Sequence, residues 1–284
     1  MASVLVTGAT GFIGQALCRS LRARGQEIVE LSTRDGDIAE PATLAKLGPV
    51  FHVYHLAGRT FVPDSWLDPV EFHRINVLGT ANVLEFCRAQ GARLTFVSAY
   101  LYGVPTRLPV SEDCVPKPNN PYALSKLLAE QLCAFHAAHH GLDVAVVRPF
   151  NIFGSGQKPH FLIPEIVRQV KQRRPIRVKD LAPRRDYLHV DDLVEALVKA
   201  SSGPGGYNVF NIGSGVSFSV GELIGMIQSV WGVDLPVSGE GSARHNEIDD
   251  VYADTRRARE LLGWTPSLTI RQGFERMMNQ ESVR

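Results

Sequence analysis

Length, composition and charge place this chain among ordinary globular proteins and exclude several functional classes. Its 284 residues, 44% of them hydrophobic, suffice for a large core with a smaller appended lobe. The 30 basic and 29 acidic residues leave a net charge of +1, which offers no broad basic surface to nucleic acid or an anionic membrane. The four cysteines lack metal-binding spacing, and the first apolar run leads into a glycine-rich loop without a signal sequence. We therefore expect a cytoplasmic protein that binds neither nucleic acid nor membrane.

From residue 3 to about 148, short apolar runs rich in β-branched residues alternate with longer helical patterns. This alternation predicts buried parallel strands joined by crossover helices. The strands are expected at Val4–Val6, Ile28–Leu31, Val50–Leu56, Leu94–Val97 and Val144–Val147, and the helices at Phe12–Arg24, Pro69–Gln90 and Asn120–His140. The predicted fold class is α/β, a Rossmann-type doubly wound parallel sheet whose ligands bind beyond the carboxyl ends of the strands.

After residue 150 the pattern changes. Residues 151–180 are loop-rich with a helix near Pro164–Arg174, residues 186–212 return to strand–helix–strand character, and residues 218–284 hold two or three helices. We expect residues 1–150, with about 181–212, to form a dinucleotide-binding domain. Residues 151–180 and 213–284, approximately, are expected to form a smaller, split C-terminal lobe that caps this domain and binds the substrate.

A glycine-rich segment stands between the first predicted strand and the first predicted helix. Its spacing is G-x-x-G-x-x-G, and its place in a strand–loop–helix unit is typical of dinucleotide binding. Gly8 permits a tight turn, Gly11 lets the backbone approach a pyrophosphate, and Gly14 allows close packing of helix on strand. The free amides and the dipole of the helix attract the anion. The residues expected to hold the cofactor here are Gly8, Thr10, Gly11, Phe12, Ile13 and Gly14.

The residues after the second predicted strand indicate which dinucleotide is used. An acidic side chain that would bind the adenosine ribose of NAD is expected directly after this strand, but Ser32 occupies the place. Ser32, Thr33 and Arg34 supply two hydroxyls and a guanidinium, which suit the 2′-phosphate of NADP. Asp37 and Ile38 are expected to lie against the adenine base. We therefore expect NADP(H), with NAD(H) as the alternative.

Tyr122 and Lys126 lie one turn apart on one face of the predicted helix Asn120–His140. A nearby ammonium and the charge of the cofactor's nicotinamide stabilise the phenolate, so we expect them to lower the pKa of Tyr122 from its usual value of about 10. Lys126 can also hold the nicotinamide ribose. Ser98, at the end of the Leu94–Val97 strand, is placed to donate a hydrogen bond to the substrate oxygen. With the glycine loop, this triad predicts an oxidoreductase that moves a proton while the cofactor moves a hydride.

Three histidines, His136, His139 and His140, lie near the end of the same predicted helix. No carboxylate or cysteine is spaced with them as a metal ligand would be. We therefore expect a solvated helix end and no metal site.

The chain resembles the extended short-chain dehydrogenases/reductases, the NAD-dependent epimerase/dehydratase superfamily, over nearly its full length. Besides TGATGFIG and YALSK, the resemblance rests on His55–Gly58, Asn76–Thr80, Ser98–Gly103, Arg148–Asn151, Arg185–Asp192, Asn211–Gly215 and Leu262–Pro266. It implies further cofactor contacts from Leu56, Ala57, Gly58, Tyr122, Lys126, Pro149, Asn151 and Ile152. It also implies that a nucleotide-diphosphate sugar is held by Thr60, Phe61, Ser98, Asn151, Leu162, Arg185 and Arg244. The two arginines have the fork-shaped cations that a diphosphate requires.

Three reactions compete within this superfamily. Dehydratases carry an Asp-Glu pair after the serine, where this chain has Ala99 and Tyr100, so elimination of water is not expected. Epimerases keep NAD bound and typically carry an acidic residue where this chain has Ser32. A reductase consumes NADPH and needs no acid beyond Tyr122.

Three segments of the chain, His55–Trp66, Asn120–Tyr122 and Arg148–Lys158, resemble the GDP-4-keto-6-deoxy-D-mannose reductases, which make GDP-rhamnose. That subgroup has N-H-I-G-P-G-Q where this chain has the residues from Asn151 to Gln157, which leaves the nucleotide and the sugar open. We expect NADPH-dependent reduction of the C4 ketone of a nucleotide-linked 4-keto-6-deoxyhexose.

Two other functions remain open: an NAD-dependent nucleotide-sugar 4-epimerase, and an NADP-binding sensor or scaffold without turnover. In the proteins that this chain resembles, the helices corresponding to residues 69–90 and 119–140 often form a four-helix dimer interface. We therefore expect a homodimer, although core packing within one subunit explains the apolar stripes of these helices equally well.

Overall fold

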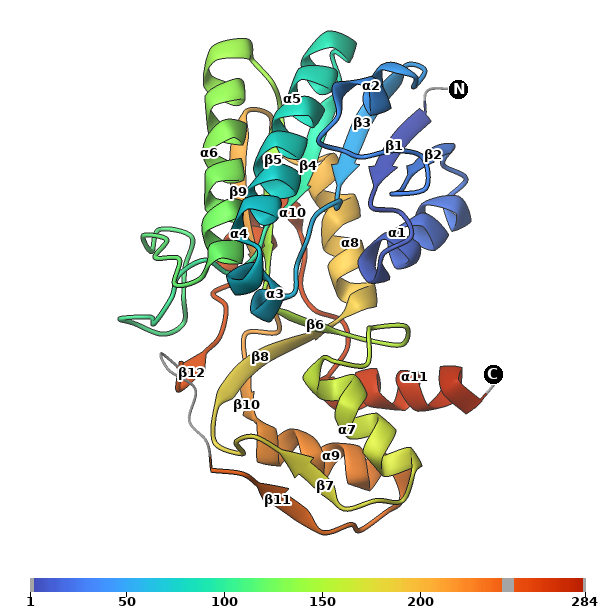
Figure 1. The fold of residues 1–284 in the computed structure, drawn as a ribbon, viewed down its shortest axis with the longest axis vertical. Helices are drawn as coiled ribbons and strands as arrows, with labels where there is room; N and C mark the ends of the chain where they lie inside the picture. The colour runs from blue at the N-terminus through green and yellow to red at the C-terminus, as the bar shows by residue number, and fades with distance from the viewer. Residues whose placement is uncertain (1–2, 242–247, 283–284) are drawn as a thin grey trace.

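The computed structural model describes residues 3–241 and 248–282, which form a large α/β body and a smaller lobe (Figure 1). The large body is built on a six-stranded parallel sheet with the strand order β2-β1-β3-β4-β5-β9. Its strands are β1 (Ser3–Thr7), β2 (Ile28–Leu31), β3 (Val50–His55), β4 (Arg93–Val97), β5 (Val144–Pro149) and β9 (Tyr207–Ile212). All five strands predicted before residue 150 are present, and the Rossmann-type fold is confirmed.

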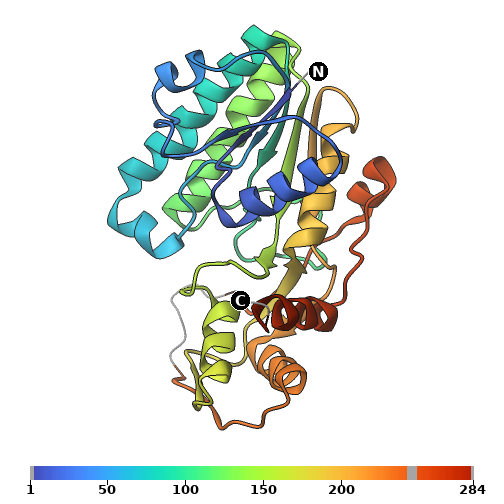
Figure 2. The same ribbon diagram turned by 90° about the vertical axis from the view of Figure 1, so that its right-hand side faces the viewer.

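Helices cover both faces of this sheet, as Figures 1 and 2 show. On one face, α1 (Phe12–Ala23) packs beside α8 (Val190–Ser201). On the other face, α5 (Gly79–Gln90) contacts both α2 (Pro41–Ala45) and α6 (Pro121–His140). Each face has its own buried apolar cluster, because the β-branched strands are apolar on both sides. Since β1 lies between β2 and β3, the chain reverses its direction of travel across the sheet there, and ligands bind at such a point.

The helix predicted over residues 69–90 is not one regular α-helix. It consists of α4 (Pro69–His73), a π-helical turn η1 (Arg74–Leu78) and α5, with helical backbone at both junctions. A short helix that the sequence analysis missed, α3 (Val62–Leu67), precedes it. A π-helical turn interrupts the regular helical spacing and often marks a functional site. Here it contains Asn76, a residue that reaches the predicted catalytic helix.

The smaller lobe contains short strands and three longer helices. Its elements are β6 (Asn151–Phe153), α7 (Leu162–Lys171), β7 (Ile176–Val178), β8 (Arg184–His189), β10 (Ser217–Ser219), α9 (Val220–Trp231), β11 (Val237–Gly239), β12 (Asp250–Val251) and α11 (Ile270–Ser282). β8 pairs with β6, β10 and β12, while β7 pairs with β11. Apolar side chains from α7, α9 and α11 share one core. Among the described residues, no helix is both long and apolar enough to span a membrane.

The chain passes between the two bodies more often than the sequence pattern indicates. We placed residues from about 181 to 212 in the large domain, but β8 belongs to the smaller lobe's sheet, and only α8 and β9 return to the large body. Conversely, α10 (Arg256–Leu262) contacts α8 and β9, although we expected it in the lobe. The reason is that a short apolar strand or helix can complete either core, and its own sequence does not specify the partner.

Candidate active site

The glycine loop after β1 closely approaches the end of β3. Gly8 has a φ of +71°, and a Cβ added there would lie 2.7 Å from the amide nitrogen of Ala57. A Cβ on Gly14 would overlap the carbonyl oxygen of Gly8. Gly11 caps α1 without a side-chain hydrogen bond in the described structure, so the first turn of this helix, with Phe12 and Ile13, keeps its amides for an anion. The backbone forms a cradle that only glycines permit, and this fits a dinucleotide pyrophosphate.

The loop after β2 holds an acidic residue that the sequence analysis missed. Asp35 accepts hydrogen bonds from both the amide and the hydroxyl of Ser32, each at 2.8 Å. These hydrogen bonds, the hydroxyl's first, lower the pKa of Asp35, so it is a carboxylate at neutral pH. Thr33 and Arg34 are exposed beside it. The donor groups of Ser32 that we assigned to a 2′-phosphate thus bind a carboxylate within the loop itself, a local bond typical of serine and aspartate.

Asp37 and Ile38, which we expected at the adenine base, contact the π-helical turn η1 and the start of α5. Asp37 accepts a hydrogen bond from the amide of Ala39 at 2.9 Å and forms an ion pair with Arg74 at 2.7 Å. Ile38 is buried against Gly79, the first residue of α5. These contacts hold the loop after β2 in place. The expected contact of Asp37 and Ile38 with the adenine base stays a prediction.

A buried chain of hydrogen bonds links the end of β1 to α5. The hydroxyl of Thr7 is 2.7 Å from Nδ1 of His55, whose Nε2 is 3.1 Å from the hydroxyl of Thr80. The amide of Ala57 donates to the hydroxyl of Thr7 at 3.2 Å, so the chain also positions Leu56 and Ala57. Burial lowers the pKa of His55 to about 3, which keeps its ring neutral. His55 is therefore a structural residue that holds the end of β3 against the glycine loop.

Asn76, in the π-helical turn, connects the β3 loop to the predicted catalytic helix. Its Oδ1 accepts from the amide of Arg59 at 2.8 Å, and its Nδ2 donates to the carbonyl of Arg59 at 3.0 Å. The same Nδ2 donates to Oγ of Ser125 at 2.9 Å, and Ser125 donates to the carbonyl of Tyr122 at 2.7 Å. A Cβ at Gly58 would lie 2.8 Å from Oδ1 of Asn76. Asn76 thereby sets the position of the helix turn that carries Tyr122.

Tyr122 lies in the first turn of α6, which begins where we expected. The side chain of Asn120 caps this helix by accepting from the amide of Ala123 at 2.8 Å. Burial, and secondarily Tyr100, raise the pKa of Tyr122. Lys126 is not among the causes of this shift, so the expected lowering of the pKa by Lys126 and the nicotinamide charge stays a prediction for the enzyme with its cofactor bound. Tyr122 is a protonated phenol at neutral pH, which suits a proton donor.

Lys126 is 5% exposed, and its Nζ lies 4.2 Å from the centre of the Phe96 ring in β4. Burial lowers the pKa of Lys126 to about 8, against the opposing effect of Glu130 one turn later. Glu130 in turn forms a buried ion pair with Arg148 of β5, whose Nε donates to Oε1 at 3.0 Å. Arg148 also donates to the hydroxyl of Tyr102 at 2.8 Å. This network holds α6 against β5 and fixes the carboxylate of Glu130 near the buried lysine.

Ser98 lies directly after β4, as expected. Ser98 is 3% exposed, and its Oγ has no hydrogen-bond partner among the described residues. A buried hydroxyl without a partner is rare in native proteins, because it loses its bonds to water without replacement. Ser98 is therefore suited to hydrogen-bond an oxygen of a bound substrate.

The residues after β5 connect the two bodies. Pro149 ends β5, and Asn151 and Ile152 form β6 at the start of the smaller lobe. The Nδ2 of Asn151 donates to the carbonyl of Asp186 at 2.9 Å. Burial raises the pKa of Asp186, while backbone and hydroxyl donors around it act in the opposite direction. Asn151 therefore has a structural contact, and its predicted contacts with cofactor and substrate stay predictions.

The residues expected at the sugar nucleotide lie on both sides of the junction. Thr60 is exposed in the loop after β3, and the neighbouring Phe61 ring is 4.3 Å from the ring of His160, just before α7. Leu162 is the first residue of α7. Arg185, in β8, donates from its guanidinium to the carbonyls of Arg184 and Ile248. The other predicted diphosphate ligand, Arg244, lies outside the described residues.

A sequence profile of the NAD dependent epimerase/dehydratase family matches residues 4–213. The chain belongs to this family. The match includes the glycine cradle, Ser98, Tyr122 and Lys126, which the fold brings to the carboxyl edge of one sheet.

Individual relatives in this family have different activities. The chain is 35% identical to a GDP-6-deoxy-D-mannose reductase of Pseudomonas aeruginosa, over 99% of this chain and 97% of the relative. It is 31% identical to a UDP-glucose 4-epimerase of Mycolicibacterium smegmatis, over 95% of each. The structure of RMD from Pseudomonas aeruginosa complexed with NADPH superimposes with a TM-score of 0.91, at 33% identity and full coverage of both chains. The structure of MoeE5 in complex with UDP-glucose and NAD superimposes with a TM-score of 0.92, also at 33% identity and full coverage of both chains.

As a member of the epimerase/dehydratase family, the chain is an enzyme that uses an NAD(P) dinucleotide and modifies a nucleotide sugar. The two residues that follow Ser98, Ala99 and Tyr100, carry no charge. The side chain of Tyr100 stacks on Phe150, with ring centres 5.3 Å apart, and Ala99 precedes it. No carboxylate therefore occupies the two positions after the serine.

Proposed function

We propose that this enzyme is an NADPH-dependent 4-ketoreductase that acts on a nucleotide-linked 4-keto-6-deoxyhexose. The observation that carries the proposal is the buried hydroxyl of Ser98, which has no hydrogen-bond partner among the described residues, and Tyr122, a phenol whose pKa is raised, is the second donor that we assign to this site. Both groups donate hydrogen bonds, so they favour a ketone oxygen that becomes an alkoxide. The similarity to the GDP-6-deoxy-D-mannose reductase, at 35% identity, supports a GDP-linked sugar.

The residues of the cradle would hold the cofactor's pyrophosphate at the start of α1, and those of the β2 loop its adenosine end. NADPH, when bound, supplies the hydride. Ser98 holds the carbonyl oxygen, and Tyr122 transfers its phenolic proton to that oxygen as negative charge develops there. Lys126 supplies a positive charge to the same region and would hold the nicotinamide ribose. Asn76 and Glu130 act indirectly, because they hold the helix that carries Tyr122 and Lys126.

The direct test is an activity screen. We expect NADPH to be oxidised with GDP-linked 4-keto-6-deoxymannose, and less efficiently with the UDP-, dTDP- and CDP-linked 4-keto-6-deoxy sugars. Product stereochemistry at C4 then identifies the sugar. If none of these substrates causes oxidation of NADPH or NADH, the proposal fails and a non-catalytic NADP-binding role gains support.

Cofactor preference tests the β2 loop separately. Arg34→Ala should raise the KM for NADPH and leave the KM for NADH unchanged, because only NADPH has the 2′-phosphate. Asp35→Asn should lower the KM for NADPH, since it removes a negative charge beside the phosphate position. Equal effects of Arg34→Ala on both cofactors would remove this assignment.

The second candidate is a nucleotide-sugar 4-epimerase. The carboxylate of Asp35 on Ser32 favours it, because an acidic group in this loop suits the ribose hydroxyls of NAD. The 31% identity to a UDP-glucose 4-epimerase also supports it. An epimerase would retain NAD through desalting and interconvert UDP-glucose and UDP-galactose without added NADPH, whereas the reductase should do neither.

A further inference from the structure

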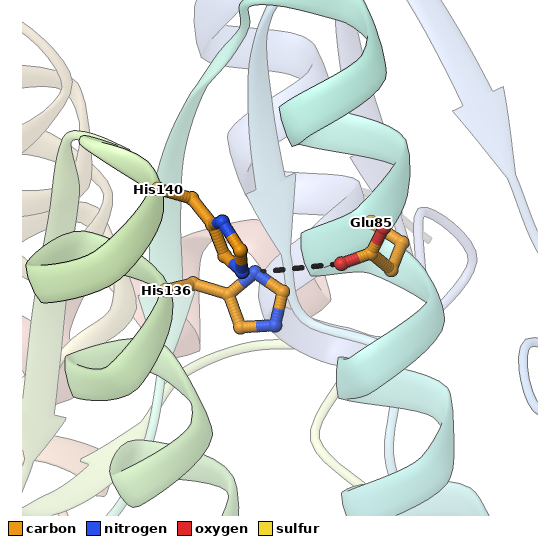
Figure 3. A group of neighbouring side chains, drawn as sticks. All are labelled: Glu85, His136 and His140. Carbon is orange, nitrogen blue, oxygen red and sulfur yellow. Dashed lines mark ion pairs between the residues drawn. The ribbon is translucent and has the colours of Figure 1, made fainter.

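Three side chains of metal-binding type meet where the middle of α5 lies beside the C-terminal end of α6 (Figure 3). His136 and His140 are four residues apart on α6, so they share a face of the helix, and Glu85 faces them from α5. One ligand atom of each residue lies within 4.8 Å of those of the other two. Figure 3 shows a nitrogen of each ring and an oxygen of Glu85 turned toward one another.

His136 is the buried member of this group. Its side chain is 10% exposed, whereas we expected the histidines to form a solvated helix end; only His139 and His140 are exposed. The Nδ1 atom of His136 has no hydrogen-bond partner among the described residues and lies 3.8 Å from Oε1 of Glu85, too far for a hydrogen bond. A buried ring nitrogen that points at a carboxylate without bonding to it indicates that a ligand belongs between them.

Arg88 fixes the orientation of the Glu85 carboxylate. Oε2 of Glu85 accepts from Nε of Arg88 at 2.9 Å, and the other oxygen, Oε1, faces the histidine rings. One carboxylate oxygen and two ring nitrogens are therefore directed at the same space.

We propose that Glu85, His136 and His140 form a binding site for a divalent transition metal of the zinc type. Two imidazoles and one carboxylate are a common donor set for Zn²⁺, with water at the fourth position. Metal–ligand bonds of about 2.0–2.2 Å place tetrahedral ligand atoms roughly 3.3 Å apart. Glu85 and His140 are exposed and can rotate inward by the distance that this requires, at most about 1.5 Å, while buried His136 stays in place.

The site is distant from the predicted chemistry. His136 follows Tyr122 by 14 residues on the same helix, which corresponds to roughly 20 Å. A bound metal would link the middle of α5 to the C-terminal end of α6, two helices that also pack together through apolar side chains. We therefore expect the ion to stabilise the fold and to leave turnover unchanged.

The experiment uses full-length protein without an affinity tag, freed of metal by a chelator. Zn²⁺ is titrated in competition with a chromophoric chelator, and bound metal is measured by elemental analysis after gel filtration. We expect one Zn²⁺ per chain and a rise in Tm on its addition. His140→Ala and Glu85→Gln change exposed side chains, so they should fold and keep reductase activity, but should weaken zinc binding about tenfold or more.

His139→Ala is the matched control, because this exposed histidine lies on the same turn but outside the group. It should keep wild-type zinc affinity and the zinc-dependent rise in Tm. Co²⁺ provides an independent readout, since a tetrahedral site gives intense visible absorption. Wild-type affinity in both His140→Ala and Glu85→Gln, or loss of binding in His139→Ala alone, would overturn the site.

Discussion

The protonation state of Tyr122 decides whether it begins the reaction as an acid or as a base. Because burial raises its pKa, the phenol holds its proton and is ready to donate it. Tyr122→Phe removes only the hydroxyl. We expect kcat to fall roughly 10²- to 10⁴-fold while the Kd for NADPH, measured by fluorescence titration, stays within about twofold.

Tyr100→Phe is the informative comparison, since it keeps the ring that stacks on Phe150 and removes a second nearby hydroxyl. Its kcat should change much less than that of Tyr122→Phe. The opposite order of effects would transfer the acid role to Tyr100.

Lys126 gives the site its pH dependence. Its pKa in the folded protein is about 8, lowered by burial from the usual 10.5, so the ammonium form predominates below pH 8 and is lost as the pH rises through that value. We expect kcat/KM for ketone reduction to decline above pH 8. Lys126→Arg retains a positive charge at every accessible pH and should move this decline to higher pH. A wild-type profile that stays flat from pH 7 to pH 10 would contradict the assignment.

The same shift affects stability in the opposite direction. Between about pH 8 and 10.5, Lys126 is neutral in the folded state and charged in the unfolded state, so unfolding binds a proton. The contribution of this group to the free energy of unfolding therefore increases with pH across that window. Between about pH 8 and 10.5, activity should therefore fall while this contribution to stability rises.

The β1–α1 loop depends on glycine for two separable reasons, left-handed backbone and close approach to β3. Gly25 has a φ of +74° and open space around its Cβ position, whereas Gly8 combines a φ of +71° with close contacts to Leu56 and Ala57. Gly25→Ala should cost about 1–2 kcal/mol for the backbone alone. Gly8→Ala should cost roughly 1–3 kcal/mol more, because β3 must move.

Urea unfolding of the two variants gives this difference directly, and Gly8→Ala should also weaken NADPH binding. Equal stability losses in Gly8→Ala and Gly25→Ala would mean that the close approach has no energetic effect.

Elements with a local signal were predicted well, and those defined by their neighbours were not. α6 begins and ends as expected because Asn120 caps one end and Gly141, at a φ of +66°, terminates the other. The π-helical turn η1 was missed because its apolar pattern continues that of the flanking helices. What distinguishes it is the contact of Asn76 with Ser125, 49 residues later.

We expect the outer face of α6 to form part of the interface of the predicted homodimer. Leu124 and Phe135 lie about three turns apart on this helix, so they share one face, and they are 40% and 53% exposed. We expect the wild-type protein to be a dimer by size-exclusion chromatography with light scattering, and Leu124→Asp/Phe135→Asp to be a monomer. Val237→Asp, an exposed apolar position in the smaller lobe, is the control and should remain a dimer. A wild-type monomer would exclude this interface.

Short-range patterns were sufficient for the parallel sheet, the glycine cradle and the pair Tyr122 and Lys126, because periodicity and spacing along one strand or helix decide these features. Contacts between separate elements were beyond such patterns. Asp35 could have been found from its position three residues after Ser32, and Glu130 from its position one turn after Lys126. Only the folded chain brings Glu85 to His136 and raises the pKa of Tyr122, since burial and proximity depend on packing between helices and strands. Local spacing along one helix therefore determined the Tyr122–Lys126 pair, whereas burial in the tertiary structure determined the protonated state of Tyr122.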